Sequence, residues 1–250
     1  MAGIIQVLII FLGLTIGSFL GLCIARIPRG ESVVYPPSRC DACGRRLGPV
    51  ELLPVLGYLI HRGRCRHCGA PVPRWYPELE VLTAAIYLSL WQHFGLSPLT
   101  IKYAFLASLL LVIAGIDLQT CTIPDPLVWL GLAAGLVFLP LGEVPWSAAL
   151  LGAGLGGGLL LLIAVLSRGG MGGGDVKVAL VMGLFLGWPE TLLALFLAVL
   201  AGAVVGLMLM LLEHRGRRDP LPFTPFLALG TMSTIWWGTT IINWYTTTFF

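Results

Sequence analysis

The chain has 250 residues, of which 57% are hydrophobic and only 11% are charged, and its formal net charge is +3. Soluble domains carry roughly a quarter of charged residues. With a mean hydropathy of +0.92, the composition excludes a water-soluble globular domain and predicts an all-α polytopic membrane protein. Membrane lipid is expected around the chain, and no nucleic-acid partner is expected.

Apolar stretches that could cross the bilayer follow one another along most of the chain, and about eight transmembrane helices are expected. Several are shorter than the roughly 20 residues of a full crossing, and the sixth is a candidate for a partly re-entrant segment. No basic residue precedes the first stretch, which favours a retained anchor over a removed signal peptide. The stretches are 4–25, 77–94, 101–118, 126–141, 147–167, 175–189, 191–213 and 223–245.

Lys and Arg residues gather on one side of the expected spans. With eight alternating crossings, 14 of the 15 basic residues fall on one face and only Lys102 falls on the other. They lie in segment 26–74, at Arg168 and Lys177 beside a glycine loop, and in segment 214–219. The positive-inside rule makes this face cytoplasmic and places both termini outside.

The segment 26–74 is the one long connection between expected spans, and it carries a repeated cysteine pattern. "CDACG" at 40–44 and "CRHCG" at 65–69 each place a glycine after a Cys-x-x-Cys pair, where a tight turn needs backbone freedom. Two such pairs can supply four thiolates to one tetrahedral zinc. The expected ligands are Cys40, Cys43, Cys65 and Cys68.

Two disulfides or a dithiol redox site would also account for the paired cysteines. The segment between the two pairs, residues 44–64, is slightly longer than the about 15–20 residues that usually separate the pairs of a zinc site. Thiols on the cytoplasmic face stay reduced, which disfavours structural disulfides. Four cysteine ligands leave no open position, so the zinc is expected to be structural and to hold the loop in shape. His67 is expected to be exposed and not a ligand.

Charged residues within apolar stretches are candidates for function because their burial is costly. Asp117 ends the third expected span and Asp175 begins the sixth, which places both at the same depth on the cytoplasmic side. Two carboxylates at a low-dielectric boundary can share one proton, so that one activates water while the other polarises a carbonyl. The pair is therefore typical of an aspartic protease.

Helix capping is the alternative interpretation of these acids. Asp175 at a helix N-terminus is well placed to cap, whereas Asp117 lies near a helix C-terminus, where the dipole disfavours negative charge. Asp125 is expected to cap the fourth span. Glu78 and Glu80 open the second span, and for them capping and function are both open.

Glycines precede Asp175 and are expected to let another backbone, such as a peptide substrate, approach its carboxylate closely. A flexible connector is the alternative. The run "GAGLGGG" at 152–158 is instead expected to allow tight helix packing. The glycines before the aspartate are Gly169, Gly170, Gly172, Gly173 and Gly174.

Six blocks of the sequence, taken in order, resemble those of the type IV prepilin peptidases, which are bifunctional leader peptidases and N-methyltransferases. The resemblance covers nearly the whole chain, and the ordered set is far more specific than a lone Gly-x-Gly-Asp. The blocks are "GSFLGLCIARIP" at 17–28, the two Cys-x-x-Cys turns, "YPELEVLTA" at 76–84, "DLQTCTIPD" at 117–125, "GGGDVK" at 172–177 and "LPFTPFLALG" at 221–230.

The resemblance implies that Asp117 and Asp175 are the catalytic aspartates and that the four cysteines belong to the cytoplasmic loop of the family. It implies cleavage of prepilin or pseudopilin leaders after a glycine, at the cytoplasmic face of the bacterial inner membrane. Methylation of the new N-terminal residue, usually phenylalanine, would follow with S-adenosylmethionine. The substrates of such enzymes serve type IV pili or type II secretion.

The expected cofactors are Zn2+ and S-adenosylmethionine, and Glu80 is a candidate for the methyl-transfer region. The expected division is a first transmembrane helix (1–25), a four-cysteine zinc-binding loop associated with methyl transfer (26–76) and a multi-span aspartyl peptidase domain (77–250). Three positions depart from the usual pattern: Gly21 replaces a common asparagine, "GPVELLP" lacks an aromatic residue and an asparagine, and Thr224 replaces a common glycine.

Two other kinds of protein also place carboxylates in membrane helices. Presenilin-type and signal-peptide-peptidase-type proteases share Gly-x-Gly-Asp, but they place a tyrosine before the first aspartate, where Ile116 stands here. A proton-coupled secondary transporter typically has carboxylates near the bilayer midplane and internal repeats. Here both acids lie at the expected membrane edge, and the spans show no repeat.

Overall fold

A computed structural model describes residues 2–141, 144–167, 171–212 and 221–249 of the chain. The roles predicted for Arg168, Gly169, Gly170 and segment 214–219 fall outside these residues. Within them the fold is all-helical, with two isolated β-bridges in segment 26–74, as the composition predicts. The chain divides into two compact units, residues 1–96 and 97–250.

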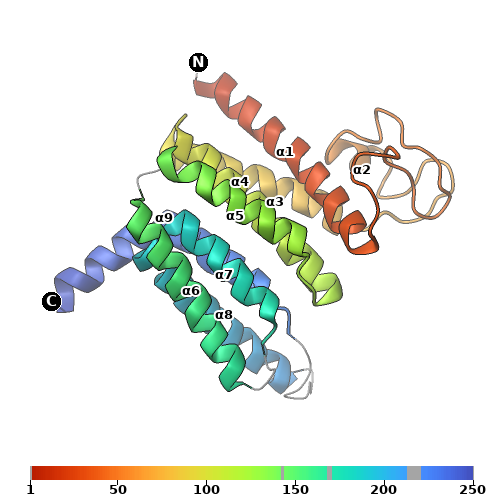
Figure 1. Ribbon diagram of the computed structural model, residues 1–250. Helices are drawn as coiled ribbons and strands as arrows, with labels where there is room; N and C mark the ends of the chain where they lie inside the picture. The colour runs from red at the N-terminus through yellow and green to blue at the C-terminus, as the bar shows by residue number, and fades with distance from the viewer. Residues whose placement is uncertain (1, 142–143, 168–170, 213–220, 250) are drawn as a thin grey trace. The chain divides into compact units, whose positions relative to one another are not determined.

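The first unit consists of two long helices joined by a largely irregular segment (Figure 1). The helix α1 (Ala2–Arg26) carries no charged residue before Arg26, and it continues into the short 3-10 helix η1 (Ile27–Arg29). The short helix α2 (Leu56–Ile60) lies within the connecting segment, and α3 (Trp75–Phe94) packs along α1.

Glycines on α1 bring the two long helices of this unit into close contact. Gly13, Gly17 and Gly21 recur every four residues and therefore lie on one face of α1. A Cβ atom added at Gly13 would come within 2.5 Å of Ala84 Cα, and one added at Gly17 within 2.6 Å of Glu80 Cα. The two backbones thus touch, which is the small-residue packing typical of membrane helices.

The second unit holds the other helices, and α7 is the one that packs against all of them. Most of its residues from Val178 to Leu186 are buried. With 14 residues, α7 is about 21 Å long, shorter than the roughly 30 Å of a hydrocarbon core. The helices of this unit are α4 (Pro98–Thr120), α5 (Asp125–Phe138) with the 3-10 helix η2 (Leu139–Leu141), α6 (Trp146–Leu166), α7 (Gly173–Leu186), α8 (Trp188–Leu212) and α9 (Thr224–Phe249).

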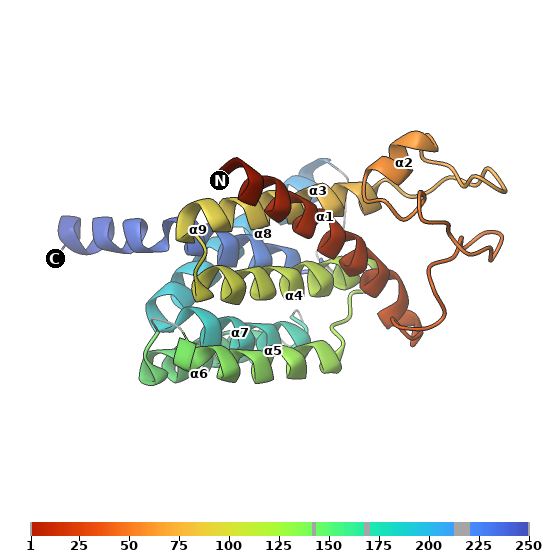
Figure 2. The same cartoon turned by 90° about the horizontal axis from the view of Figure 1, so that it is seen from above.

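The helices α6 and α7 lie side by side (Figure 2) and touch through glycine. A Cβ atom added at Gly152 of α6 would lie 2.6 Å from the Gly187 carbonyl carbon and 2.8 Å from the Gly183 oxygen. One added at Gly154 would have no atom within 4 Å. The packing role predicted for the run 152–158 is therefore confirmed for the face that meets α7.

Each of the predicted spans coincides with a helix of the structure. By length and composition, four of the described helices suffice to cross a membrane: α1 with its 3-10 extension, α4, α6 and α8. The chain is thus a polytopic membrane protein, while the number of eight crossings stays a prediction. The helix α7, which corresponds to the sixth predicted span, ends at Leu186, three residues before the predicted boundary. It ends there because Gly187 turns the chain with a φ of 87°.

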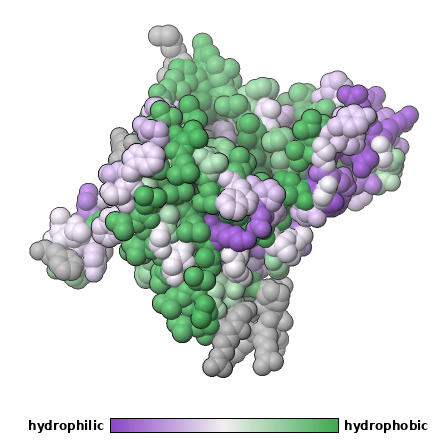
Figure 3. All heavy atoms as spheres, viewed as in Figure 1, coloured by the Kyte–Doolittle hydropathy of each residue, from purple (hydrophilic) through white to green (hydrophobic). Residues whose placement is uncertain are grey.

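The surface of the helices is apolar, as lipid contact requires. Figure 3 shows hydrophobic residues over most of the visible surface of the helices, with a smaller hydrophilic patch among them, whereas many hydrophilic residues gather over segment 26–74. On α6, for example, Leu161, Leu162 and Val165 each expose more than half of their surface. Apolar faces this extensive are not found on water-soluble monomers. The membrane lipid predicted around the chain would cover these apolar faces.

Replacing Gly152 by Leu should destabilise the second unit, because the new side chain has no room between α6 and α7. Overpacking of this kind typically lowers stability by about 1–3 kcal/mol. We expect the denaturation midpoint in detergent to fall by at least about 3 °C. The matched control is Gly154→Leu in the same helix, which should leave the midpoint within about 1 °C. Equal midpoints for the two variants would contradict the contact.

Candidate active site

The two aspartates predicted to act together come from opposite ends of two helices in the second unit. Asp117 lies in the last turn of α4, and Asp175 lies in the first turn of α7. The two residues are 5% and 7% exposed, respectively. Both carboxyl groups are therefore buried at one end of the unit, as the sequence pattern predicts.

A single residue, Thr224, joins the two aspartates. It is the first residue of α9 and is fully buried. Its backbone N–H donates to Asp117 Oδ2 at 3.1 Å, and its hydroxyl donates to Asp175 Oδ1 at 3.3 Å. The ends of α4, α7 and α9 thus converge on one point, where two carboxyl groups share one neighbour.

This arrangement differs from helix capping, the alternative interpretation of the acids. The residue in the N-cap position of α7 is Gly172, and no side chain makes a capping hydrogen bond there. The hydrogen bond of Asp175 goes instead to Thr224 of another helix. A residue whose only task is to cap its own helix has no need of such a partner.

The prediction that Asp125 caps the following helix is wrong. The N-cap position of α5 belongs to Pro124, and no side-chain capping hydrogen bond forms. The Asp125 carboxylate pairs with Lys177 Nζ of α7 at 2.5 Å, and both side chains are about half exposed. The reason is that Lys177, two residues after Asp175, brings a cation within reach. An exposed pair of this kind indicates contact with water near the aspartates.

The glycines before Asp175 have different surroundings. A Cβ atom added at Gly174 would lie 2.8 Å from Ile123 Cδ1, so this glycine makes room for a side chain of the same unit. A Cβ atom added at Gly173 would meet no atom within 4 Å. The space predicted for an approaching backbone is therefore present at Gly173, whereas Ile123 occupies it at Gly174.

The four cysteines predicted to bind zinc lie together in the first unit. Their Sγ atoms all lie within 4.8 Å of one another, and those of Cys40 and Cys68 are 3.8 Å apart. Four sulfurs bound to one zinc at about 2.3 Å in a tetrahedron are themselves about 3.8 Å apart. The cluster therefore fits one tetrahedral zinc ion with little rearrangement.

The two cysteine turns have the same backbone structure. The Gly44 N–H donates to Cys40 O at 2.8 Å, and the Gly69 N–H donates to Cys65 O at 2.9 Å. Gly44 and Gly69 have φ angles of 70° and 72°, in the left-handed region that favours glycine. This is why each Cys-x-x-Cys pair needs the glycine that follows it.

The pKa values of the two thiols in the second Cys-x-x-Cys pair are shifted in opposite directions. Hydrogen bonds from the backbone N–H groups of Cys68 and His67 lower the pKa of Cys65 to about 7. The Ala70 N–H lowers the pKa of Cys68, but desolvation and the neighbouring sulfurs outweigh it and raise that pKa to about 11. Four thiolates this close together repel one another, so full ionisation needs a bound cation.

Two residues beside these sites were predicted with less definite roles. His67 is exposed, as predicted, and its Nδ1 lies 3.0 Å from Arg45 Nη1. Glu80 lies in α3 and is 7% exposed. Its Oε2 accepts a hydrogen bond from the Val55 N–H at 2.6 Å, which ties segment 26–74 to α3.

Thr224 is the functional candidate that the sequence pattern alone did not identify. In the sequence it stands out only as a departure from a glycine that is common at this position. Its place between Phe223 and Pro225, at the start of the last apolar stretch, gave a weak signal of a helix N-terminus. Nothing in the local sequence relates it to residues 49 and 107 positions away.

Two buried carboxyl groups meeting in a helical membrane unit define a candidate intramembrane aspartyl peptidase. Comparison with known proteins also indicates a peptidase. Residues 11–94 match the family described as the Bacterial Peptidase A24 N-terminal domain, and residues 104–207 match the Type IV leader peptidase family. No solved structure matches the chain.

Curated relatives align with almost the full chain. The prepilin leader peptidase/N-methyltransferase of Bacillus subtilis is 36% identical over 96% of this chain and 97% of its own length. The protein of the same name from Aeromonas hydrophila is 32% identical over 97% and 94% of the two chains. That of Pseudomonas aeruginosa is 30% identical over 94% and 91%. The chain therefore belongs to the type IV leader peptidase family.

Protein purified under reducing conditions without chelator should contain about one zinc per chain, because the cluster offers one four-thiolate site. Replacing Cys40 and Cys43 by Ser should reduce the zinc content to near zero and make segment 26–74 sensitive to protease. The control is Cys121→Ser, which removes an exposed thiol outside the cluster and should leave the zinc content unchanged. Wild-type protein with negligible metal would contradict the prediction.

Proposed function

We propose that this chain cleaves the leader peptide from prepilins or pseudopilins and then methylates the new N-terminal amine. Membership of the family makes it a membrane-embedded leader peptidase, and the names of the relatives support both activities. The observation that carries the proposal is the convergence of Asp117 and Asp175 on Thr224. It brings two acids that are far apart in the sequence to one buried point.

Peptide cleavage at this point follows the chemistry of paired carboxyl groups. One carboxylate takes a proton from water, and the water oxygen attacks the carbonyl carbon of the scissile bond. The other carboxyl group, protonated, donates a hydrogen bond to the carbonyl oxygen as negative charge develops there. The tetrahedral intermediate then collapses: the C–N bond breaks, and the leaving nitrogen takes a proton. Asp117 and Asp175 perform these two roles.

Thr224 acts on this pair as a positioning residue. Its N–H and hydroxyl hold one oxygen of each aspartate, which fixes the orientation of the carboxyl planes. A buried carboxylate also needs hydrogen-bond donors, because an unpaired charge in an apolar unit is strongly disfavoured. The same contacts therefore serve stability and orientation.

The membrane setting determines how the substrate approaches. A prepilin joins a basic leader to a long hydrophobic helix, and this helix would lie in the bilayer beside the enzyme. The scissile bond would then reach the aspartates at the cytoplasmic boundary of the bacterial inner membrane. The positive-inside distribution of Lys and Arg supports this orientation, as does the exposed pair of Asp125 and Lys177 close to the site.

The cysteine cluster would bind a structural zinc that holds segment 26–74 in its folded shape. Cys40, Cys43, Cys65 and Cys68 occupy all four positions of a tetrahedral ion, so no position stays open for water or substrate. S-adenosylmethionine, when bound, supplies the methyl group that the freed amine accepts. The protein has only to hold this amine in line with the methyl carbon, which is a task of positioning.

Replacing either Asp117 or Asp175 by Asn should lower the rate of leader cleavage by at least about 100-fold, because each change removes an acid–base group. The rate is measured by the mass shift of a prepilin incubated with purified enzyme in detergent. Asp125→Asn is the matched control, since it breaks an exposed ion pair that contributes at most about 1 kcal/mol. Substantial cleavage by either dyad variant would rule out the aspartyl mechanism.

Replacing Thr224 by Val removes the hydroxyl that holds Asp175 but keeps the backbone N–H. We expect kcat for cleavage to fall by about 2–10-fold, the effect of one hydrogen bond of about 0.5–1.5 kcal/mol, with KM little changed. Thr224→Ser retains a hydroxyl and should restore most of the rate. Equal rates for the Val and Ser variants would show that the side chain has only a packing role.

A further inference from the structure

The short helix α2 carries an apolar face that the described residues leave exposed. Leu56, Leu59 and Ile60 each expose more than half of their surface. Their spacing of three and four residues places them on one side of the helix. The opposite side is packed, because a Cβ atom added at Gly57 would lie 2.7 Å from the Glu51 carbonyl oxygen. The three large side chains, called the α2 face below, thus form an apolar surface within a polar segment.

The contacts of α2 place this face beside the apolar part of the first unit. The Val55 N–H, at the start of α2, donates to Glu80 Oε2 at 2.6 Å. Glu80 lies against α1 at Gly17, where an added Cβ atom would come within 2.6 Å of Glu80 Cα. Gly17 precedes Arg26, the last residue of α1, by a distance of about 13 Å along the helix. Because α1 is long and apolar enough to cross a membrane, α2 begins beside its apolar part and not beyond its end.

The backbone at both ends of α2 adopts an unusual conformation. Val55 before the helix and Arg62 after it have φ angles of 59° and 52°, in the left-handed region that side chains of these kinds rarely adopt. The Val55 N–H is held by Glu80, and the Arg62 N–H donates to Leu59 O at 3.1 Å. Such conformations persist where the surrounding structure imposes them. The orientation of the α2 face is therefore set by the fold of the unit.

A surface pocket lined with arginine adjoins this face. Its volume is about 400 Å³, and its lining includes Tyr58 of α2 together with Arg62, Arg64 and Arg74. All three arginines are exposed, and the lining, which falls wholly within the described segment 58–74, contains no acidic residue. Among the described residues, none of the three forms an ion pair. This arginine pocket thus presents three positive charges to a ligand from outside the chain.

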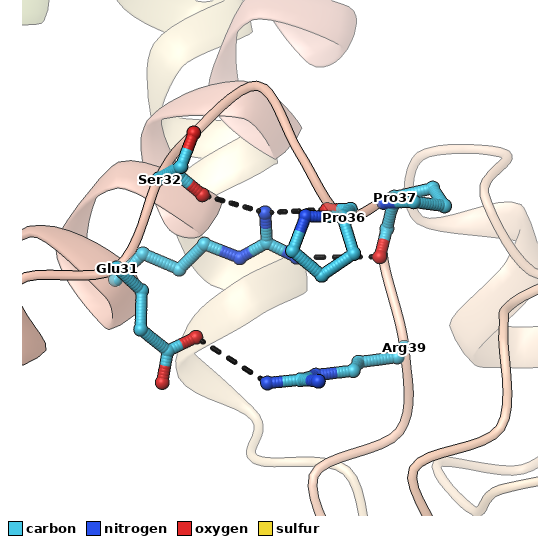
Figure 4. Close-up of polar contacts among 6 residues, drawn as sticks. Glu31, Ser32, Pro36, Pro37 and Arg39 are labelled. Carbon is cyan, nitrogen blue, oxygen red and sulfur yellow. Dashed lines mark hydrogen bonds and ion pairs between the residues drawn. The ribbon is translucent and has the colours of Figure 1, made fainter.

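Other arginines of the connecting segment have partners within it. The guanidinium of Arg26 is buried and donates to the carbonyl oxygens of Ser32, Pro36 and Pro37 at 3.0, 2.8 and 3.3 Å. Figure 4 shows these three residues around the guanidinium, with Glu31 facing Arg39. These arginines hold the segment in its folded shape. The positive charge of the arginine pocket, by contrast, is available to a ligand.

We propose that the α2 face and the arginine pocket together form a docking surface for anionic lipid headgroups of the membrane that the chain spans. The α2 face inserts at the membrane edge, as the apolar side of an interfacial helix does. Tyr58 lies between the two parts, at the headgroup level where amphipathic rings are common. The guanidinium groups bind lipid phosphate through paired hydrogen bonds, and their charge favours anionic over zwitterionic lipid.

This docking goes beyond the proposed peptidase and methyltransferase activities and does not depend on them. Cys65 follows Arg64 directly in the chain, so a lipid bound in the arginine pocket also restrains the second cysteine turn. The membrane would thereby stabilise the one long polar segment of the first unit from outside. An apolar face on a polar segment is explained in the same way, because lipid covers it.

Hydrogen exchange of the full-length protein in lipid nanodiscs tests the arginine pocket. Amides of residues 56–62 should exchange at least about tenfold more slowly in phosphatidylglycerol than in phosphatidylcholine, because anionic lipid attracts the arginines. The double variant Arg62→Gln with Arg74→Gln should lose most of this difference. Arg45→Gln with Arg66→Gln is the matched control, because it removes the same charge from exposed arginines outside the pocket and should keep the difference.

Two results would overturn the proposal. Equal exchange of the wild type in the two lipids would show that no anionic headgroup binds, and loss of the difference in both double variants would show an effect of net charge alone. Inorganic phosphate added to phosphatidylcholine nanodiscs should not slow exchange of these amides. If it does so as well as phosphatidylglycerol, the pocket binds a soluble anion and the proposal fails. Zinc content and denaturation midpoint report whether each variant keeps its fold.

A photoreactive benzoylphenylalanine in place of Leu59 tests the α2 face itself. After irradiation in phosphatidylglycerol nanodiscs, the intact mass of the protein should show a lipid adduct. Ala42, an exposed residue in the first cysteine turn, is the control position and should give little adduct. A second copy of the chain as the main cross-linked product at Leu59 would show that protein covers the face. That result, or equal lipid adducts at the two positions, would overturn the proposal.

Discussion

The need to satisfy two buried carboxyl groups dominates the second unit. Asp117 and Asp175 lie in an apolar setting where an unpaired charge is strongly disfavoured, and both obtain a donor from Thr224. For this to happen, the end of α4 and the beginnings of α7 and α9 must meet at one point. The helix α7, whose first turn carries Asp175, also contacts each of α4, α5, α6, α8 and α9.

Glycine allows the helices of both units to pack closely. The hydrophobic effect gives little help to helix association in lipid, so close van der Waals packing has to replace it. In the second unit, Gly152 lets α6 approach the carbonyl groups at the end of α7. In the first unit, Gly13 and Gly17 bring α1 against α3 in the same way. Both units therefore use backbone contact where a soluble protein would use interlocking large side chains.

The two units of the chain carry different polar groups. The first unit has a polar connecting segment with the cysteine cluster, a buried glutamate and a cavity. Among the described residues of the second unit, the two aspartates are buried around Thr224, while Lys102 is buried near the other end of α4. Peptide hydrolysis needs that isolated pair of acids, whereas methyl transfer needs only positioning of an amine and a cofactor. The acid pair that the proposed hydrolysis needs lies in the second unit.

The sequence by itself determined the helical membrane class, the positions of the helices, the four-cysteine cluster and the pairing of Asp117 with Asp175. These properties depend on local composition, on short spacings and on membrane sidedness. Only the tertiary structure decided that Thr224 bridges the aspartates, that Lys177 pairs with Asp125, and that Ile123 fills the space at Gly174. These contacts join residues on different helices. Their partners are set by how the helices pack in three dimensions, which the periodicity of a single helix does not encode.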